Sequence, residues 1–506
     1  MISAPAIVRS STGIGLVAVA AGLLAQYLFI DAGLGINVPI ATAALLAAGW
    51  VVRDEGKPAP RLADAWLAPA ALTLAAFVAL RGDGTLVTLD VLGAIVLSGA
   101  ALASFGGLRV LERPFAAVAE LAGRLALSGI TAGARPLAAI ASALPTTKGS
   151  ARGGQVAPVL RGLLIAAPLV VLFVFLFASA DAVFARITED LLDWNLDLES
   201  VPGRLALMAV VAWVAAGLLA FVAKGEDRPP RAASSTRGLG RLRPGSAEAV
   251  TVLVVLDLLF IGFVVLQAQY LFGGRDTLEA SGITYAEYAR RGFFELLAVA
   301  FVVGGLIVAL EAFVRARSTG YVAAAIGLVI LTFGVLASAF LRLRLYQDAY
   351  GWTELRFYVL AAIIWLAIGA VMAMATLATN RTRWLMHGML LLSVTFGIAF
   401  NVIGPVRLIA EQNVERAIHP ELVAPGGETG LDVYYLASLG DDALPVLSEG
   451  ICSLPGPFGV ESFHSVQIWT RSVVHDDAGR AWQAWNLSRE RARDLKVTEL
   501  CLLSDR

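Results

Sequence analysis

Long apolar runs separated by short polar gaps dominate the chain. A helix that crosses a bilayer needs about 20 mainly apolar residues, because each residue rises about 1.5 Å and the backbone polar groups must bond within the helix. The pattern predicts about eleven such helices, and Pro39 and Pro69, which interrupt two short runs, leave a count of about ten or twelve open. The predicted spans are 12–30, 36–52, 64–81, 89–108, 160–180, 204–223, 248–271, 292–314, 319–341, 355–378 and 383–403.

These runs predict an all-α polytopic membrane protein with a small C-terminal extracytoplasmic domain. In the C-terminal domain, 414–417, 431–439 and 482–495 are predicted as helices. The chain divides into an N-terminal four-helix membrane region (1–108), an amphipathic interfacial segment on the cytoplasmic side (109–159), membrane helices five and six (160–223), a cytoplasmic polybasic linker (224–247), membrane helices seven to eleven (248–403) and the extracytoplasmic C-terminal domain (404–506).

The amphipathic segment has two interpretations. Within 113–146, a predicted helix has an apolar side and a polar side. The apolar side carries Phe115, Val118, Leu121, Ala122 and Leu125, and the polar side carries Glu120, Arg124 and Ser128. A helix lying in the membrane interface and a weakly apolar cytoplasmic helical hairpin both fit this pattern.

Composition supports a membrane protein. Hydrophobic residues make up 58% of the 506 residues and charged residues 16%, whereas charged residues are about a quarter of an ordinary soluble domain. The net charge of −1 hides a segregation of charge along the chain. Of the lysines and arginines before residue 404, 21 lie at the amino terminus or in alternate gaps on the same predicted side, and 9 lie in the opposite gaps. The positive-inside rule therefore predicts a cytoplasmic amino terminus, and an odd number of spans then places the carboxyl terminus outside the cytoplasm.

Both cysteines of the chain, Cys452 and Cys501, fall in the predicted extracytoplasmic domain. In an oxidising compartment they are expected to form one disulfide, but two unpaired cysteines are the alternative, because spacing alone does not show whether their Cα atoms approach. The chain has no CxxC, HExxH, Walker A or GxSxG motif and no nucleic-acid-binding module. We therefore expect no metal, no cofactor and no nucleic-acid partner, and we favour a non-enzymatic role.

The densest polar side chains fall at the predicted outer ends of the second half of the chain. They have two interpretations: ion pairs within helices together with an aromatic interfacial belt, or a site where arginines hold a phosphate or carboxylate while tyrosines donate hydrogen bonds. The candidate ligand-binding residues are Tyr285, Glu287, Tyr288, Arg291, Glu295, Arg342, Arg344, Tyr346, Asp348, Glu354 and Arg356.

Three further polar residues lie within predicted spans: Asp257, Gln267 and Asn401. A carboxylate such as Asp257 is costly inside a bilayer and needs a partner or a proton. A proton or ion pathway is one explanation, and a hydrogen bond between helices is the other.

Several stretches between about 160 and 500 match a family pattern. They are FLFASADAVFARI at 175–187, QAQYLFGG at 267–274, TYAEYARRGFFELL at 284–297, LRLYQDAYGWTELRFY at 343–358, LDVYYLASLGDDALPVL at 431–447 and WQAWNLSRERA at 482–492. With them, the chain resembles a family of bacterial multi-pass membrane proteins catalogued as domain of unknown function 4173, which is related to domain of unknown function 4153. The resemblance implies no reaction and no catalytic residue.

Two hypotheses of function follow. The first is an envelope-associated binding or assembly protein in the bacterial cytoplasmic membrane, whose outer polar face and C-terminal domain bind an anionic lipid head group, an envelope polymer or a partner protein. The second is a transporter or membrane-embedded lipid-handling enzyme that uses Asp257 and the outer Arg/Tyr/Glu cluster.

Overall fold

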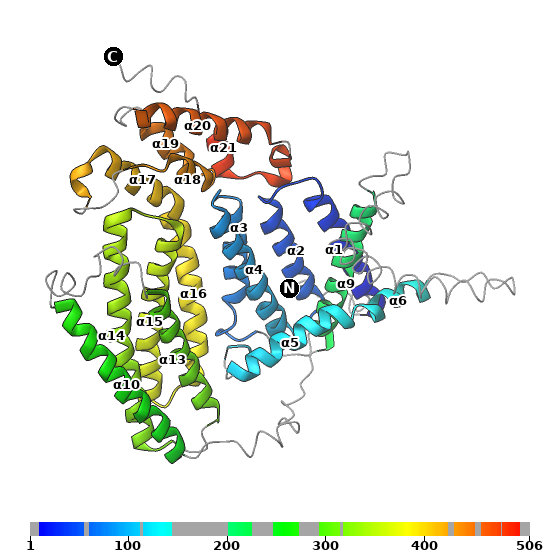
Figure 1. Cartoon of the computed structure of the whole chain (residues 1–506). Helices are drawn as coiled ribbons and strands as arrows, with labels where there is room; N and C mark the ends of the chain where they lie inside the picture. The colour runs from blue at the N-terminus through cyan, green and yellow to red at the C-terminus, as the bar shows by residue number, and fades with distance from the viewer. Residues whose placement is uncertain are drawn as a thin grey trace, which may run out of the picture.

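The structure is a computed structural model that describes residues 10–54, 60–111, 115–143, 201–224, 246–272, 293–313, 317–423, 430–450, 457–476 and 478–495. Regular structure in these ranges is helical, and one isolated antiparallel bridge joins Asp83 to Gly440. The described helices form two bundles that stand side by side beneath a layer of C-terminal helices (Figure 1). The predicted span 160–180 and most of the polybasic linker lie outside the described residues.

The first bundle contains five helices and has two more across one end. Its apolar core includes Leu67, Leu74 and Leu102. Gly22 shows how closely two of its helices approach, because a Cβ there would lie 2.4 Å from the carbonyl oxygen of Met208. The helices are α1 (Ser11–Phe29), α2 (Asn37–Val52), α3 (Leu67–Val78), α4 (Gly84–Phe105) and α9 (Val201–Lys224), crossed by α5 (Phe115–Thr131) and α6 (Ala134–Ala143).

The second bundle packs around Tyr321, Leu328 and Leu343, which are fully buried. A polar cluster closes the end of this bundle that is distant from the C-terminal helices: Tyr321 donates to Glu311 at 3.0 Å, and Arg317 pairs with Glu311 and donates to Thr382 at 2.9 Å. The helices are α10 (Ser246–Phe272), α13 (Phe293–Phe313), α14 (Thr319–Tyr350), α15 (Glu354–Ala378) and α16 (Arg383–Ile403).

Seven of the described helices are long and apolar enough to cross a membrane, namely Ser11–Phe29, Gly84–Phe105, Gly203–Ala223, Glu248–Gln267, Thr319–Tyr350, Glu354–Ala378 and Trp384–Ile403. Two shorter apolar helices, α2 and α3, accompany them. Pro39 and Pro69 lie in the first turns of α2 and α3, where the missing N–H has no intrahelical partner to lose. These prolines therefore fall at helix beginnings and do not break the two helices.

The predicted amphipathic segment forms α5 and α6, and α5 runs across the bundle axis instead of along it (Figure 1). Leu121 and Leu125 are buried against the bundle, and Glu120 and Arg124 form an exposed ion pair at 2.6 Å, as the sequence pattern predicts. The pattern is wrong for Ala122, which is exposed, and for Ser128, which donates to Gly217 O of α9 at 2.9 Å. Ile130 is also exposed. The structure thus places the polar and apolar faces of α5 and leaves the choice between an interfacial helix and a cytoplasmic hairpin as a prediction.

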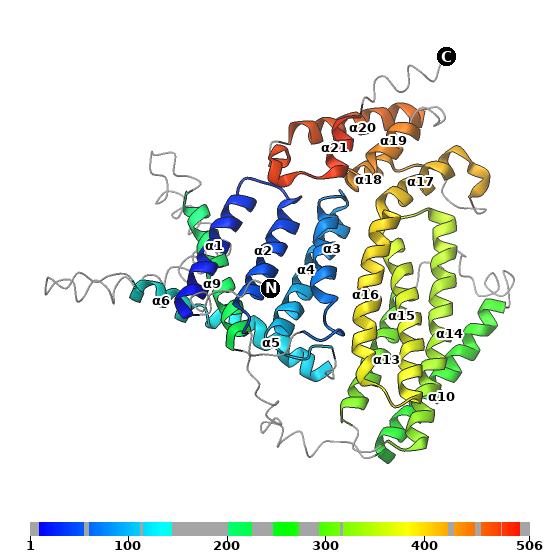
Figure 2. The same ribbon diagram turned by 180° about the vertical axis from the view of Figure 1, so that it is seen from behind.

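We call the described part of 405–495 the cap. Figure 2 shows it lying over the ends of both bundles. On the first bundle, Ile36 N donates to Trp485 O at 3.0 Å and Leu487 N donates to Ala79 O at 2.9 Å. On the second bundle, Asn413 exchanges hydrogen bonds with the Trp352 backbone at 2.8 and 3.0 Å. Its helices are α17 (Pro405–Ile418), α18 (Val433–Ser438), α19 (Leu444–Gly450), α20 (Pro457–His475) and α21 (Leu487–Arg493), with 3₁₀ turns at Pro420–Leu422, Ala478–Arg480 and Trp482–Ala484.

One predicted helix of the cap is wrong. The predicted helix 482–495 is a 3₁₀ turn followed by α21, because Asn486 adopts an extended backbone and caps α21 by accepting from Arg489 N at 3.1 Å. Trp482 and Trp485 consequently remain partly exposed, whereas Ala492 is buried.

Several described connections between helices lie at the cap end of the bundles. The charge pattern predicts that these connections lie outside the cytoplasm. Arg204, at the start of α9, donates to Asp31 after α1 at 2.6 Å, and the connection between α3 and α4 contacts the cap through Gly82 N and the Asp442 carboxylate at 2.8 Å. The cap side is therefore one continuous face built from these gaps and from the residues that follow the last predicted span.

Candidate functional site

An open groove with a volume of about 530 Å³ lies between the two bundles, and we call it the interbundle cleft. It lies between α3 and α4 on one side and α13, α15 and α16 on the other. Its size falls within the range of roughly 300–1,000 Å³ that is typical of small-molecule sites. Its walls are almost wholly apolar, with Leu74, Leu97, Phe301, Trp365, Phe396 and Phe400 among the lining residues.

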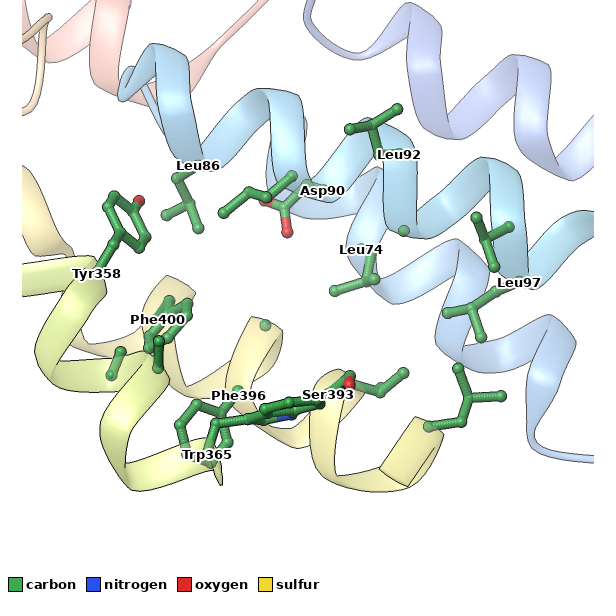
Figure 3. Close-up of a pocket in the computed structure, with 18 of the residues that line it drawn as sticks. Leu74, Leu86, Asp90, Leu92, Leu97, Tyr358, Trp365, Ser393, Phe396 and Phe400 are labelled. Carbon is green, nitrogen blue, oxygen red and sulfur yellow. Dashed lines mark hydrogen bonds between the residues drawn. The ribbon is translucent and has the colours of Figure 1, made fainter. Parts of the chain in front are cut away.

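One face of α4 forms a wall of this cleft. Leu86, Asp90, Gly93 and Leu97 follow one another at spacings of three or four residues, which places them on the same side of a helix. Asp90 is therefore a single carboxylate within an apolar stripe. Figure 3 shows its side chain pointing into the space between α4 and the helices that carry Tyr358 and Phe400.

Asn401 of α16 holds this carboxylate from the other bundle. Its amide nitrogen donates to both Asp90 oxygens, at 2.9 and 3.0 Å, and to the Gly397 carbonyl oxygen at 3.0 Å. Both side chains are buried, with exposed fractions of 1% for Asp90 and 0% for Asn401. The Asn401 side-chain oxygen is buried and has no hydrogen-bond partner among the described residues.

Tyr358 lines the same end of the cleft, near the cap. Its hydroxyl is buried and faces the Asp83 carboxylate, although no described group meets full hydrogen-bond geometry with it. The charges of Glu354 and Asp90 also act on it. The cleft is thus apolar along most of its length and polar at one end. Asp90 and Tyr358 line the polar end, and Asn401 holds the Asp90 carboxylate.

Charged residues form a rim where this polar end meets the cap, and we define the rim as Arg81, Asp83, Glu354 and, from the cap itself, Asp442. Asp83 caps α4 by accepting from Leu86 N at 2.9 Å, and its second oxygen has no hydrogen-bond partner within the described ranges. Burial of Asp83 raises the pKa of its carboxyl to about 6, and the nearby negative charges of Glu354 and Asp442 raise this pKa further against the hydrogen bond from Leu86. The Arg81 guanidinium donates to the backbone carbonyl oxygen of Asn401.

The three described arginines of the predicted outer cluster contact groups within their own bundle. Arg342 donates to Gln267 at 3.0 Å, where Ser338 also donates at 3.0 Å. Arg344 lies 3.7 Å from Asp348 and packs near Trp352. These contacts place Gln267, Arg342, Arg344 and Asp348 along α10 and α14, and none of these four residues lines the interbundle cleft.

Arg356 donates to the carbonyl oxygens of Tyr350 and Gly351 at 2.9 and 2.6 Å, and its guanidinium lies 4.0 Å from the centre of the Tyr346 ring. Glu354 belongs to the rim. Glu295 is exposed near the start of α13. Tyr285, Glu287, Tyr288 and Arg291 lie outside the described residues, as do Cys452 and Cys501, so the cluster as a ligand site and the disulfide stay predictions.

Asp257 lies on α10 against Gly327 of α14, where a Cβ on Gly327 would be 3.4 Å from its carboxylate. One of its oxygens is buried without a hydrogen-bond partner among the described residues. Within the described ranges, the chain also contains no group of three histidine, cysteine, aspartate or glutamate residues that could hold a metal ion.

Sequence reasoning identified Asn401 but missed Asp83, Asp90 and Tyr358. The signal for Asp90 was available, because it is a carboxylate within the predicted span 89–108, as Asp257 is within 248–271. Tyr358 and Asp83 carry no such signal, because a tyrosine or an N-cap aspartate at a helix end is common in any membrane protein.

Comparison with known proteins gives one match. No curated protein and no solved structure matches the chain. The family model described as Domain of unknown function (DUF4153) matches residues 40–450, which include the second bundle, the cleft, the first part of the cap and the first bundle apart from α1 and the start of α2. The chain therefore belongs to this family of unknown function.

Proposed function

We propose that the protein binds a membrane amphiphile in the interbundle cleft, with an apolar chain in the cleft and a polar head at Asp90 and Tyr358. The observation that carries this proposal is an apolar groove of about 530 Å³ that ends in a buried carboxylate. It is a binding function, in keeping with the non-enzymatic role favoured by the sequence.

The position of the cleft supports a lipid-like ligand. Three of the helices that line it, α4, α15 and α16, are long and apolar enough to cross a membrane. Lipid chains surround such helices, and an apolar wall gives them van der Waals contacts without an unsatisfied polar group. A water-soluble polar ligand would instead lose its hydration along most of this cavity.

The polar end supports a defined orientation of the ligand. Asp90 and Tyr358 lie near the cap, whereas Trp365 and Leu97 lie farther along their helices. The head of an amphiphile would therefore lie beneath the cap and its chain would extend toward the other end of the bundles. We further propose, because the charge pattern favours it, that the protein lies in a bacterial cytoplasmic membrane with about eleven spans and the cap outside the cytoplasm. The ligand would then come from the outer leaflet.

Photocrosslinking from inside the cleft tests this proposal. A benzophenone amino acid replaces Phe396, which lines the cleft, or Val402, which is 72% exposed and lies outside it. After irradiation in native membranes, mass spectrometry identifies the lipid adducts at each position. We expect Ala362→Trp, which fills the cleft, to lower lipid adducts at position 396 severalfold and to leave those at position 402 unchanged.

The matched control is Ile364→Trp on the same helix, because Ile364 is exposed and does not line the cleft. It adds the same ring while leaving the cavity open. Equal adduct yields at position 396 in the Ala362→Trp and Ile364→Trp proteins would refute the proposal.

A further inference from the structure

The polar end of the cleft is rich in hydrogen-bond acceptors. Both Asp90 oxygens share one amide nitrogen of Asn401, and a carboxylate has room for about four hydrogen bonds. The Tyr358 hydroxyl beside it faces the Asp83 carboxylate, another acceptor, without reaching full hydrogen-bond geometry with a described group. A ligand head at this position therefore meets acceptors with unused capacity and one hydroxyl that both donates and accepts.

The charges around this end are mainly negative. Asp83 lies close enough to Asp90 to act on it electrostatically, and Glu354 acts on Tyr358 together with both aspartates. Arg81 also acts on Asp90, with the opposite sign, but its guanidinium donates to the backbone oxygen of Asn401. This contact therefore directs the Arg81 guanidinium toward the backbone of α16 and away from the cleft.

This arrangement disfavours an anionic head. A phosphate brings further acceptors and negative charge to a buried carboxylate, and like charges repel more strongly where water is excluded. A hydroxyl or ammonium group instead donates to the carboxylate and uses its remaining acceptor capacity.

We infer that the head group bound at the polar end is a hydrogen-bond donor, a hydroxyl or an ammonium, and is not a phosphate. This inference rests on the proposed binding of an amphiphile in the cleft. It differs from the anionic head group that the arginines of the outer cluster led us to expect, because those described arginines lie elsewhere and the cleft presents Asp90 in their place.

A lipid-competition experiment with the full-length protein tests this inference. The protein carries the benzophenone amino acid at position 396 and is reconstituted in phosphatidylcholine vesicles that contain dioleoylglycerol, oleylamine and dioleoyl phosphatidic acid at equal low mole fractions. The readout is the enrichment of each lipid among adducts at position 396 relative to adducts at the exposed position 402. We expect dioleoylglycerol, oleylamine or both to be enriched at least about threefold, and phosphatidic acid not to be enriched.

Two variants test which residues carry the selectivity. Asp90→Asn keeps the shape of the side chain but removes its charge and half of its acceptor character, and Tyr358→Phe removes only the hydroxyl. Both should reduce the enrichment toward one while lipid adducts still form at position 396. Thr395→Ala is the matched control on α16, because Thr395 is exposed, bonds only to the Leu391 carbonyl oxygen at 2.8 Å and does not line the cleft.

The outcomes separate this inference from the proposed function. Enrichment of phosphatidic acid at position 396, or enrichment of the donor lipids that survives both Asp90→Asn and Tyr358→Phe, overturns the inference while leaving the cleft a lipid site. Adducts at position 396 that do not respond to Ala362→Trp overturn the proposed function itself. Enrichment of dioleoylglycerol alone identifies a neutral head, and enrichment of oleylamine alone identifies a cationic one.

Discussion

The side-chain amide of Asn401 donates to both carboxylate oxygens of Asp90, at 2.9 and 3.0 Å. The two residues are 311 positions apart in the sequence and lie on helices of different bundles. This contact therefore joins α4 to α16 at the polar end of the interbundle cleft, and it satisfies a carboxylate that would otherwise be buried among apolar side chains.

Removal of the Asn401 amide should destabilise the protein more than removal of the whole pair. Asn401→Leu leaves the Asp90 carboxyl buried without its donor, which costs about 1–3 kcal/mol or more. In the double variant Asp90→Leu, Asn401→Leu, both polar groups are replaced by apolar ones, and we expect part of this loss to be recovered. Thermal unfolding in detergent measures both effects, and a double variant less stable than Asn401→Leu would contradict the expectation.

Asp83 should make stability depend on pH. Its carboxyl has a pKa of about 6 in the folded protein and 3.8 in the unfolded reference, so the folded protein binds more protons between these values. Stability contributed by this group therefore falls as pH rises from about 4 to 6 and is constant above about 7. The difference between the two pKa values corresponds to about 3 kcal/mol.

Asp83→Asn tests this dependence, because asparagine caps a helix as well as aspartate does. We expect the variant to gain up to about 3 kcal/mol at neutral pH and to show a flatter melting temperature between pH 4 and pH 7. Asp432→Asn is the control, since Asp432 caps α18 by accepting from Tyr435 N at 2.9 Å but is exposed. If the melting temperatures of Asp83→Asn and Asp432→Asn depend on pH in the same way as that of the unmodified protein, Asp83 does not cause the pH dependence of stability.

The sequence predicted most of the described membrane helices, because each depends on a local run of apolar residues. It did not predict the interbundle cleft, because apolar runs show that a helix is buried in lipid or protein but not which face meets which partner. The Asp90 and Asn401 pair illustrates this limit: each residue is visible in its own span, but their contact depends on how two bundles dock. The predicted helix 482–495 in the cap was wrong for a different reason. Asn486 separates a 3₁₀ turn from α21, although the residues on both sides of it follow the pattern of one amphipathic helix.

Asn486 should control the docking of the cap on the first bundle. Its amide donates to the carbonyl oxygens of Val78 and Arg81, both at 2.8 Å, and its side-chain oxygen caps α21. Asn486→Ala removes all three bonds and should cost about 2–4 kcal/mol, since each contributes about 1 kcal/mol and the carbonyl groups remain partly buried. We expect faster proteolysis of the cap in the detergent-solubilised protein.

Asn486→Asp separates capping from docking, because aspartate still caps α21 but presents oxygens to the two carbonyl groups. It should increase proteolysis about as much as Asn486→Ala. Gln483→Ala provides the control, since Gln483 makes a longer, exposed bond of 3.3 Å to Tyr27 O. A cap that stays protected in both Asn486 variants would show that apolar packing alone holds it.

Labelling of single cysteines from outside the cell should show in which leaflet the polar end of the cleft lies. In a protein with Cys452 and Cys501 replaced by serine, Tyr434→Cys lies on the cap and Thr319→Cys lies at the start of α14, and both positions are exposed. The charge pattern predicts that a membrane-impermeant thiol reagent applied to intact cells labels position 434, and that position 319 is labelled only after the membrane is opened. The two positions control for each other, because cells that leak label both. Labelling of position 319 alone from outside would reverse the topology, and the head group bound at Asp90 would then come from the cytoplasmic leaflet.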